Sequence, residues 1–451
     1  MIRYHASWVV PVTSSPIQNG VVVVDGSHIA FVGPRREAPR ADDDVDLGDA
    51  VLLPGLVNAH THLELTAMRG FLEGLEFTQW IRQLTAARAA VLDDAAMLDS
   101  ARVGVAEGLL AGITTYADTC SSGVAIQAMR ELGVRGIMYQ EVFGPAPEQH
   151  DVAMEGLAAA IERSRPFESD LVQLGVSPHA PYTVHDDLMV DAAAFAIRHG
   201  MPVAIHLAES KAEIAFLREG EGPFATALRA RGIDVVRRSH SPVHWLVELG
   251  VVLAHPLLIH CVQVDATDIA FIAEHQCPVA HCPASNAKLG HGVAPARAML
   301  DAGVVVGLGS DSVASNNMMD LLGEARQAVF AQNAASGRPD ALGAHEALAV
   351  ATIGGARALG LAGRIGSLEA GKEADLAAFP LDGVRATPAF DPEVALVFAL
   401  PGTAARLVTV AGRELVRDGR LVAGTLDGAV TERVRAHARA LLAWREEARR
   451  R

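Results

Sequence analysis

The sequence is poor in lysine, in aromatic residues and in long apolar runs, and each shortage excludes a class of protein. Only three of the 38 basic residues are lysine and the net charge is −15, so the chain lacks the basic face that nucleic-acid binding requires. Aromatic residues make up 5% of the chain, which limits any extended stacking platform. No apolar run reaches about 18 residues, the length of a membrane span. We therefore expect partners that are neither nucleic acids nor membranes.

Cysteine is also scarce. The sequence contains four cysteines and no Cys-x-x-Cys pair, so a thiolate zinc knuckle or a redox pair is not expected. Four cysteines in a chain of this length do not make a disulfide framework. The N-terminus, MIRYHASWVVP, lacks a basic leader followed by an apolar core and a cleavage site. These features predict a cytoplasmic protein.

Apolar strands alternate with Ala-rich helical segments from about residue 51 onward. Eight strands are expected, and they end near His60, Asp118, Glu141, Val176, His206, His260, His281 and Gly309. Strands that alternate with helices pair in parallel, and eight such units predict an α/β fold, a closed (β/α)8 barrel of the TIM type. In such barrels the active-site residues follow the C-terminal ends of the strands.

Both ends of the chain are strand-like. Residues 21–24 and 29–33 flank the turn signal Asp25-Gly26, which predicts a hairpin, and strand patterns return after residue 364. We expect residues 1–50 and 364–426 to pair as one small β-sandwich domain, which would place the chain termini near each other. Residues 51–363 are expected to form the barrel domain, and residues 427–451 a C-terminal helix.

Histidines and one aspartate stand where the predicted strands end. His60 and His62 are two residues apart, so in a strand they point to the same face. Alone, such a pair is more often a polar feature of a loop, and a histidine that ends a strand is more often structural. His206, with Glu209 three residues later, and Asp311, after a glycine that lets the backbone turn, supply further groups. Together they predict a shell for a divalent metal ion, Zn²⁺ first and Fe²⁺ as the alternative.

Five segments resemble the amidohydrolase superfamily: PGLVNAHTHLE, SPHAPYT, IHLAES, HCPASNAKLGHGVAP and GLGSDS. The likeness is strongest to the branch of aminohydrolases and chlorohydrolases that act on nucleobases, nucleosides and triazines, and it covers nearly the whole chain. The resemblance implies a metal-dependent hydrolase of carbon–nitrogen bonds in cyclic amidines. Because relatives in this superfamily often form dimers or larger assemblies, it also implies a homo-oligomer.

The resemblance also implies a role for each motif residue. It makes four residues the metal ligands: His60, His62, His206 and Asp311. Glu209 matches the acid/base glutamate, and His260 matches the histidine that polarises the substrate or its tetrahedral oxygen. His179 matches the histidine that contacts the substrate ring. Asp311, close to metal and water, would also take the first proton.

The number of metal ions is a separate question. Many two-metal members of the superfamily carry a carboxylated lysine at the end of the fourth strand. Here that strand ends in Ser177-Pro178-His179 and the three lysines lie elsewhere, so the resemblance implies one ion. Glu141, which ends the third strand, is the one residue that could bridge a second ion; otherwise it is a core or rim carboxylate.

The segment after His62 bears on the substrate. Glu64 either accepts a hydrogen bond from a base amine or is a helix N-terminal charge favoured by the dipole. Trp80, at helical spacing from Phe77 and Ile81, is either packing or a wall for a base. The pattern HTHLE…RG…F…W is similar to deaminases of 6-amino-6-deoxyfutalosine, an adenosine-like menaquinone precursor, and to methylthioadenosine and S-adenosylhomocysteine deaminases. The His-Leu-Glu run favours the former.

The leading prediction is therefore a metal-dependent deaminase of an aminopurine nucleoside-like small molecule, which releases ammonia. One alternative uses the same site on another bond: a halide or an alkylamine of a triazine, or a cyclic amide. Another is an inactive barrel that serves as a binding module, and it is disfavoured because no expected ligand is missing. His281 and Asn286 receive no chemical role from the sequence alone.

Overall fold

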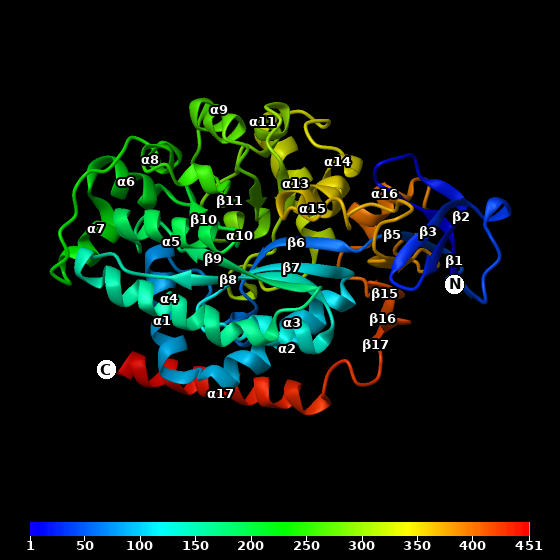
Figure 1. Cartoon of the computed structure of the whole chain (residues 1–451), viewed down its shortest axis with the longest axis horizontal. Helices are drawn as coiled ribbons and strands as arrows, with labels where there is room; N and C mark the ends of the chain where they lie inside the picture. Colours follow the sequence, from blue (N-terminus) through cyan, green and yellow to red (C-terminus); the bar gives the residue numbers. More distant parts are fainter. Residues whose placement is uncertain (451) are drawn as a thin grey trace.

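The computed structural model describes residues 1–450, and its centre is a barrel of parallel strands (Figure 1). Within that range the barrel strands are β6 (Leu56–Thr61), β7 (Ile113–Cys120), β8 (Arg135–Val142), β9 (Val172–Pro178), β10 (Ala204–Leu207), β11 (Leu257–His260), β12 (Val279–His281) and β13 (Val306–Leu308). They form two four-stranded parallel sheets, β6–β9 and β10–β13. Isolated bridges from Val176 to Val203 and from Thr61 to Asp311 join the two sheets. The predicted (β/α)8 barrel is confirmed.

Helices follow the barrel strands and cover the barrel from outside (Figure 1). Their bounds are α1 (Phe77–Val91), α2 (Asp94–Leu110), α3 (Ala125–Leu132), α4 (His150–Ser164), α5 (Asp186–Arg198), α6 (Lys211–Glu219), α7 (Gly222–Arg229), α8 (Pro242–Glu248), α9 (Ala266–Glu274), α10 (Pro283–Lys288), α11 (Ala296–Asp301), α12 (Val313–Asn316), α13 (Leu321–Ser336), α14 (Ala344–Ala349) and α15 (Gly355–Ala358). Every residue of β6, β7 and β11 is buried. Strands covered on both faces read as near-continuous apolar runs, which is why these strands could be recognised in the sequence.

A second sheet is built from both ends of the chain. Its strands are β1 (Ile2–Val9), β2 (Ile17–Asp25), β3 (His28–Pro34), β4 (Asp43–Asp46), β5 (Ala50–Pro54), β14 (Leu376–Pro380), β15 (Leu407–Val410), β16 (Arg413–Arg417) and β17 (Arg420–Leu421). The predicted hairpin is β2–β3, and the antiparallel pairing of β5 with β14 joins the two chain ends. Ile29 of β3 and Leu407 of β15 belong to one apolar cluster, so the sheet folds over on itself as a small sandwich.

The first barrel strand begins later than the sequence suggested. Residues 51–53 read as the run that leads into His60, but they lie in β5, parallel to β1 and antiparallel to β14. The chain then crosses between the sheets at Gly55, whose N–H donates to Asp375 O at 2.8 Å. The apolar run is continuous because both β5 and β6 are buried, which hides the change of sheet. The domain limits at residues 50 and 364 stay predictions.

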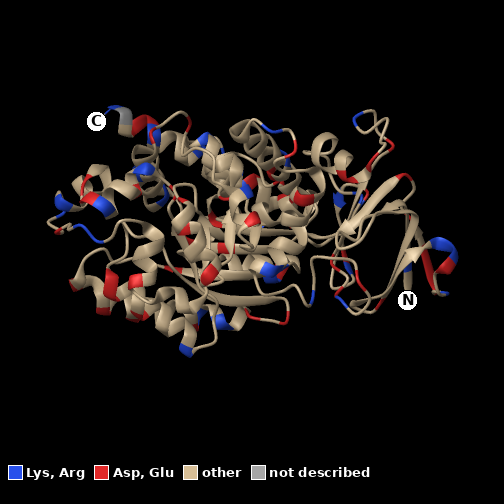
Figure 2. Cartoon of the chain, turned by 90° about the horizontal axis from the view of Figure 1, so that it is seen from above, with Lys and Arg blue, Asp and Glu red and all other residues tan. Residues whose placement is uncertain are grey.

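The two chain termini do not lie near each other, although the terminal strands pair. N and C stand at opposite ends of the molecule in Figures 1 and 2. The reason is α17 (Gly428–Arg450), about 35 Å long, which leaves the small sheet and runs back beneath the barrel. Arg433 Nε donates to Asp99 Oδ2 at 2.6 Å, and Arg445 Nη1 donates to Phe71 O at 2.7 Å. The predicted C-terminal helix is present; Arg451, its predicted last residue, lies outside the described residues.

The outside of the molecule carries charges of both signs. Figure 2 shows Lys and Arg interspersed with Asp and Glu over the outer helices and loops. Within residues 1–450, no helix combines the length and the hydropathy that a membrane crossing needs.

Arg135, at the start of β8, ties the barrel to the second sheet through a buried ion pair. Its Nε donates to Asp375 Oδ2 at 2.8 Å, and both side chains are 1% exposed. Replacing Arg135 by methionine would leave this carboxylate buried without a partner charge. We expect the free energy of unfolding to fall by about 3–5 kcal/mol, measured by denaturant titration. The control is Arg364→Met, which removes an ion pair from an arginine that is 39% exposed and should cost at most about 1 kcal/mol. Equal losses of unfolding free energy in the two variants would contradict a stabilising role for the buried Arg135–Asp375 pair.

Candidate active site

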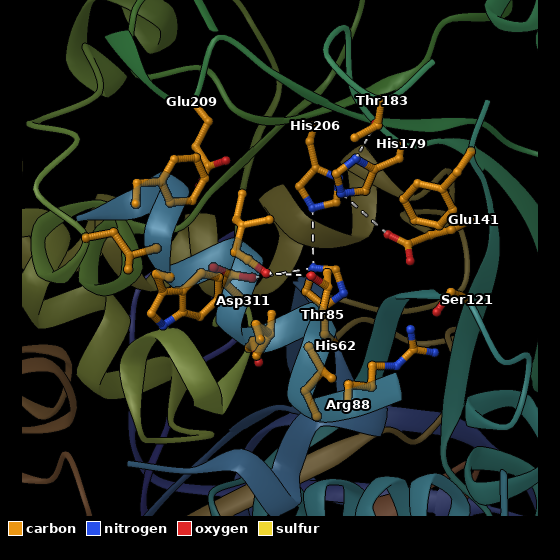
Figure 3. A pocket seen from close by; sticks show the side chains of 18 of the residues that line it. His62, Thr85, Arg88, Ser121, Glu141, His179, Thr183, His206, Glu209 and Asp311 are labelled. Atoms are coloured by element: carbon orange, nitrogen blue, oxygen red, sulfur yellow. Dashed lines mark hydrogen bonds and ion pairs between the residues drawn. The ribbon is translucent and has the colours of Figure 1, made fainter. Parts of the chain in front are cut away.

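A cavity of about 250 Å³ lies at the C-terminal end of the barrel strands. Its lining includes the following residues predicted from the sequence: His62, Glu64, Trp80, His179, His206, Glu209, His260 and Asp311. His60 lies immediately behind the wall and is 1% exposed. Figure 3 shows the labelled side chains of this set converging from several strand ends on one space.

The histidines at the end of β6 share a point with His206 and Asp311. Nε2 of His60 is 3.3 Å from Asp311 Oδ1, and Nε2 of His62 is 3.6 Å from the same oxygen. Nε2 of His62 is also 3.3 Å from Nε2 of His206. Thr119 Oγ1 lies 3.2 Å from Nδ1 of His62 and 3.4 Å from its Nε2, so this hydroxyl holds the edge of the ring beside the shared point. β6 ends at Thr61, between the two histidines, and their i, i+2 spacing produces this convergence at the end of the strand.

These four groups fit a divalent ion. Three imidazoles and one carboxylate are a usual donor set for zinc, and ligands 2.0–2.1 Å from a tetrahedral ion are about 3.3–3.4 Å apart. The three separations given above are 3.3–3.6 Å. The ligand atoms of His60, His62 and His206 lie within 4.8 Å of one another, as do those of His60, His260 and Asp311. Within the described residues, Nε2 of His60 is buried and has no hydrogen-bond partner. Because a buried nitrogen without a partner is costly, this atom is explained if it binds a metal.

The carboxylate of Asp311 is fixed by its surroundings. Oδ2 accepts hydrogen bonds from Ser285 Oγ at 2.5 Å and from Ser315 Oγ at 2.8 Å, which turns Oδ1 toward the histidines. The backbone of Asp311 has φ +55°, a left-handed conformation that costs a non-glycine residue free energy and is common at functional sites. His260 has φ +75°, so two site residues are held in such conformations.

The glycine before Asp311 has a different function from the one expected. The sharp turn occurs at Asp311 itself, and φ of Gly309 is not in the left-handed region. A Cβ atom at Gly309 would lie 2.8 Å from Cβ of His60 and 2.9 Å from Sγ of Cys282. Glycine is therefore required there because β13 and β6 approach closely, and this approach brings Asp311 to His60.

Burial keeps the imidazoles uncharged and their lone pairs available. It lowers the pKa of His60 to about 4 and holds the pKa of His206 well below its usual range. Burial alone would raise the pKa of Asp311, but its contact with His60 and the other histidines nearby hold it well below its usual range. Neutral imidazoles beside an ionised carboxylate are the protonation states that a metal requires.

Glu209 and His260 lie beside this point. Glu209 Oε1 is 3.6 Å from Nε2 of His260 and 3.2 Å from Nε2 of His291. Burial would raise the pKa of Glu209, but the charge of His260 and the contact with His291 lower it below its usual range. Nδ1 of His260 is 2.9 Å from Oδ1 of Asn286, so Asn286 fixes the ring with Nε2 toward the cavity.

Asn286 can be tested as a residue that positions His260. Asn286→Ala removes the acceptor of the ring Nδ1–H, and we expect kcat to fall about 10- to 100-fold because small misplacements of reacting groups have effects of that size. Asn286→Asp keeps an acceptor at the same place and should retain more activity than Asn286→Ala. Both variants should keep their metal content. Equal activity of Asn286→Ala and the wild type would exclude this role.

His179 and Glu141 form a second wall of the cavity. Nδ1 of His179 is 2.8 Å from Thr183 Oγ1, and its Nε2 is 3.9 Å from Glu141 Oε1. Burial lowers the pKa of His179 to about 3 and raises the pKa of Glu141 to about 8. His179 thus presents a neutral imidazole to the cavity, where a substrate ring can contact it. The group formed by Glu141, His179 and His206 has ligand atoms within 4.8 Å of one another, so a second ion at Glu141 stays an open prediction.

Trp80 and Glu64, which were predicted to contact the substrate, both line the cavity but differ in their hydrogen bonds. Trp80 is 7% exposed, and its Nε1 has no hydrogen-bond partner among residues 1–450. Its ring stacks on Phe77 with centroids 6.4 Å apart. Trp80 therefore packs against the protein and still has an N–H group that a substrate could accept from. The carboxylate of Glu64 is already hydrogen-bonded by the loop after β7. A direct contact from either residue to a substrate stays a prediction.

The sequence did not identify His291, although it lies inside the quoted HCPASNAKLGHGVAP segment. It is 6% exposed and contacts both Glu209 and the ring of Phe77, whose centroid is 4.4 Å away. A histidine between two glycines in that segment was the available signal.

His281 ends β12 and is 2% exposed, and neither ring nitrogen has a partner within the described part of the chain.

This chain is similar in sequence and in fold to known deaminases and matches one protein family. Residues 51–416 match the Amidohydrolase family. A 5-methylthioadenosine/S-adenosylhomocysteine deaminase of Moorella thermoacetica is 34% identical over 92% of this chain and 93% of its own length. An adenosine deaminase of Xanthomonas campestris, solved with bound zinc, is 29% identical with TM-score 0.87 and 98% coverage of both chains. Aminofutalosine deaminase of Helicobacter pylori, solved with methylthio-coformycin, is 21% identical with TM-score 0.80, covering 92% of this chain and all of its own; at that identity the likeness concerns the fold.

Proposed function

Because the chain belongs to the amidohydrolase family and is a hydrolase of carbon–nitrogen bonds, we propose that it removes the amino group of adenine nucleosides with a 5′ substituent, releasing ammonia. The observation that carries the proposal is the convergence of the proposed metal-binding groups, a carboxylate and a histidine at one cavity. Glu209 Oε1 and Nε2 of His260 are 3.6 Å apart, and both residues line the same cavity as His62 and Asp311.

The proposed metal ligands are His60, His62, His206 and Asp311. Zn²⁺ is the proposed ion, supported by the donor set and by zinc in the Xanthomonas campestris structure; Fe²⁺ also suits these donors. A divalent ion held there lowers the pKa of a water molecule from 15.7 toward about 7. One ion per chain is proposed, because no lysine stands at the end of β9 to bridge two.

The protein side chains then move the protons. Asp311 takes the first proton from the attacking water, whose oxygen forms a bond to the ring carbon that bears the amino group. That proton passes through Glu209 to the adjacent ring nitrogen. Glu209 then moves the second proton of the same oxygen to the departing amine, so the C–N bond breaks, a C=O bond forms and ammonia leaves. His260, fixed by Asn286, stabilises the charge that develops on the attacking oxygen. His179 and Trp80 are proposed to hold the purine.

The choice among nucleosides rests on two different supports. The name of the Moorella thermoacetica relative favours 5′-methylthioadenosine and S-adenosylhomocysteine. The His-Leu-Glu run after His60 favours 6-amino-6-deoxyfutalosine. All three are adenine nucleosides extended at the 5′ position, so the class is the same and the extension differs.

A substrate panel tests the proposal. Ammonia release by the metal-loaded protein would be measured with adenosine, 5′-methylthioadenosine, S-adenosylhomocysteine, 6-amino-6-deoxyfutalosine and a chlorotriazine. We expect turnover of at least one 5′-substituted nucleoside, with a kcat/KM above that of adenosine. Turnover of the triazine alone would favour the chlorohydrolase alternative, and no turnover of any aminopurine would refute the proposal.

A further inference from the structure

An ion pair stands in the cavity wall away from the proposed reacting groups. Arg88, near the end of α1, places Nη2 3.1 Å from Oε1 of Glu64, and both residues line the cavity. Figure 3 shows the Arg88 side chain directed toward Ser121 and Glu141, on the opposite side of His62 from Glu209. The proposed reaction does not use this pair.

Glu64 is held too firmly to change partners easily. Its Oε1 accepts from Ser121 Oγ at 2.9 Å, and its Oε2 accepts from Ser122 Oγ at 2.5 Å, Ser122 N at 3.2 Å and Cys120 Sγ at 3.0 Å. These four hydrogen bonds saturate the carboxylate, so its contact with Arg88 orients the guanidinium.

Arg88 itself keeps donors available. Its Nε contacts Sδ of Met97 at 3.3 Å and its Nη2 faces Glu64; within residues 1–450 no hydrogen bond engages Nη1. The side chain is 27% exposed. Of the described residues that line the cavity, Arg88 is the one lysine or arginine. A guanidinium with free N–H groups beside an apolar wall is suited to bind a carboxylate.

Helix α1 runs along the cavity from the side of Glu209 to Arg88. Its first residue, Phe77, contacts His291, which is 3.2 Å from Glu209. Arg88 is eleven residues further along α1, a rise of about 16 Å. Residues between them line the cavity at helical spacing: Trp80, Ile81, Leu84 and Thr85. A nucleoside with its amino group at Glu209 would therefore direct a long substituent along α1 toward Arg88.

We propose that Arg88, oriented by Glu64, binds a carboxylate at the end of the 5′ substituent, so that the substrate class is an adenine nucleoside with an acidic 5′ extension. This inference rests on the proposed deaminase function. Among the candidates it separates 5′-methylthioadenosine, which ends in a methyl group, from S-adenosylhomocysteine and 6-amino-6-deoxyfutalosine, which both carry a carboxylate.

A matched pair of substrates tests the inference. The probes are 5′-thioadenosine bearing a 3-carboxypropyl group on sulfur and the corresponding carboxamide, which differ in charge but hardly in size. We expect the wild type to favour the acid in kcat/KM by about 10- to 100-fold, mainly through KM. In Arg88→Gln this preference should fall to about one, and Arg88→Lys, which keeps the charge but loses the planar fork, should be intermediate.

Arg231→Gln is the control, because Arg231 lines a neighbouring cavity that shares Phe143, Tyr182 and Thr183 with this one. It should keep the preference for the acid. Equal kcat/KM for acid and amide in the wild type, or a preference that survives in both Arg88 variants, would overturn the proposal. Loss of the preference in Arg231→Gln would move the carboxylate site to the neighbouring cavity.

Failure of the deaminase proposal gives a different result. In that case metal-loaded wild type would release no ammonia from 5′-methylthioadenosine or adenosine. Calorimetric binding of the acid and the amide then still tests Arg88, because the expected difference in affinity does not depend on turnover. Equal affinities of wild type and Arg88→Gln for the acid would refute the carboxylate site.

Discussion

Glu209→Gln should keep the bound metal and lose at least about 100-fold in kcat, the contribution typical of a general acid/base. The glutamine has nearly the same shape but cannot carry the proton from water to the ring nitrogen and the leaving amine. Glu209 is not one of the proposed metal ligands, so metal content measured by elemental analysis should stay at the wild-type value. Ammonia release in steady state gives kcat.

The control for Glu209 is Glu219→Gln, an exposed glutamate at the end of α6. It should match the wild type in both measurements. If Glu209→Gln retained near-normal turnover, another group would have to carry the proton, and His291 at 3.2 Å would be the first to examine.

Asp311→Asn should have a comparably large effect with a different signature. The substitution removes the charge beside His60 and His62 and the proposed acceptor of the first proton. We expect kcat/KM to fall at least about 100-fold and metal affinity to fall as well. Competition with a chelator measures the affinity, and initial rates at saturating metal measure the chemical loss separately.

Two further variants serve as comparisons for Asp311→Asn. Ser315→Ala removes one hydrogen bond to Asp311 Oδ2 and should lower metal affinity or activity by about tenfold, as loss of an outer partner of a metal ligand does. Asp301→Asn, at the exposed end of α11, should change neither. Unchanged metal affinity and activity in Asp311→Asn would remove Asp311 from the site.

Much of the fold and the core of the candidate site could be predicted from sequence because both follow from short-range periodicity. Strands buried on both faces read as apolar runs, and the active-site end of a barrel is where those runs stop. His206, His260 and Asp311 were found in this way. The spacing of His60 and His62 predicted that both would face one point, and both Nε2 atoms do lie within 3.6 Å of Asp311 Oδ1.

The remaining features depend on contacts between loops, for which the sequence carries no period. The contact of His291 with Glu209 and the saturation of Glu64 by the loop after β7 join segments that only the closed barrel brings together. Residues 51–53 were predicted to lead into the barrel but lie in the second sheet. The sequence hides this because two buried strands follow each other with only Gly55 between them. The C-terminus lies far from the N-terminus because α17 is long enough to cross the molecule.

The most direct measurement is a titration of metal-free protein with Zn²⁺ while ammonia release from a 5′-substituted adenine nucleoside is followed. We expect negligible turnover without metal, a linear rise, and a plateau at about one ion per chain, with Glu209→Gln binding the same amount without turnover. Full activity in metal-free protein, or one bound ion with no deamination of any adenine nucleoside, would contradict it.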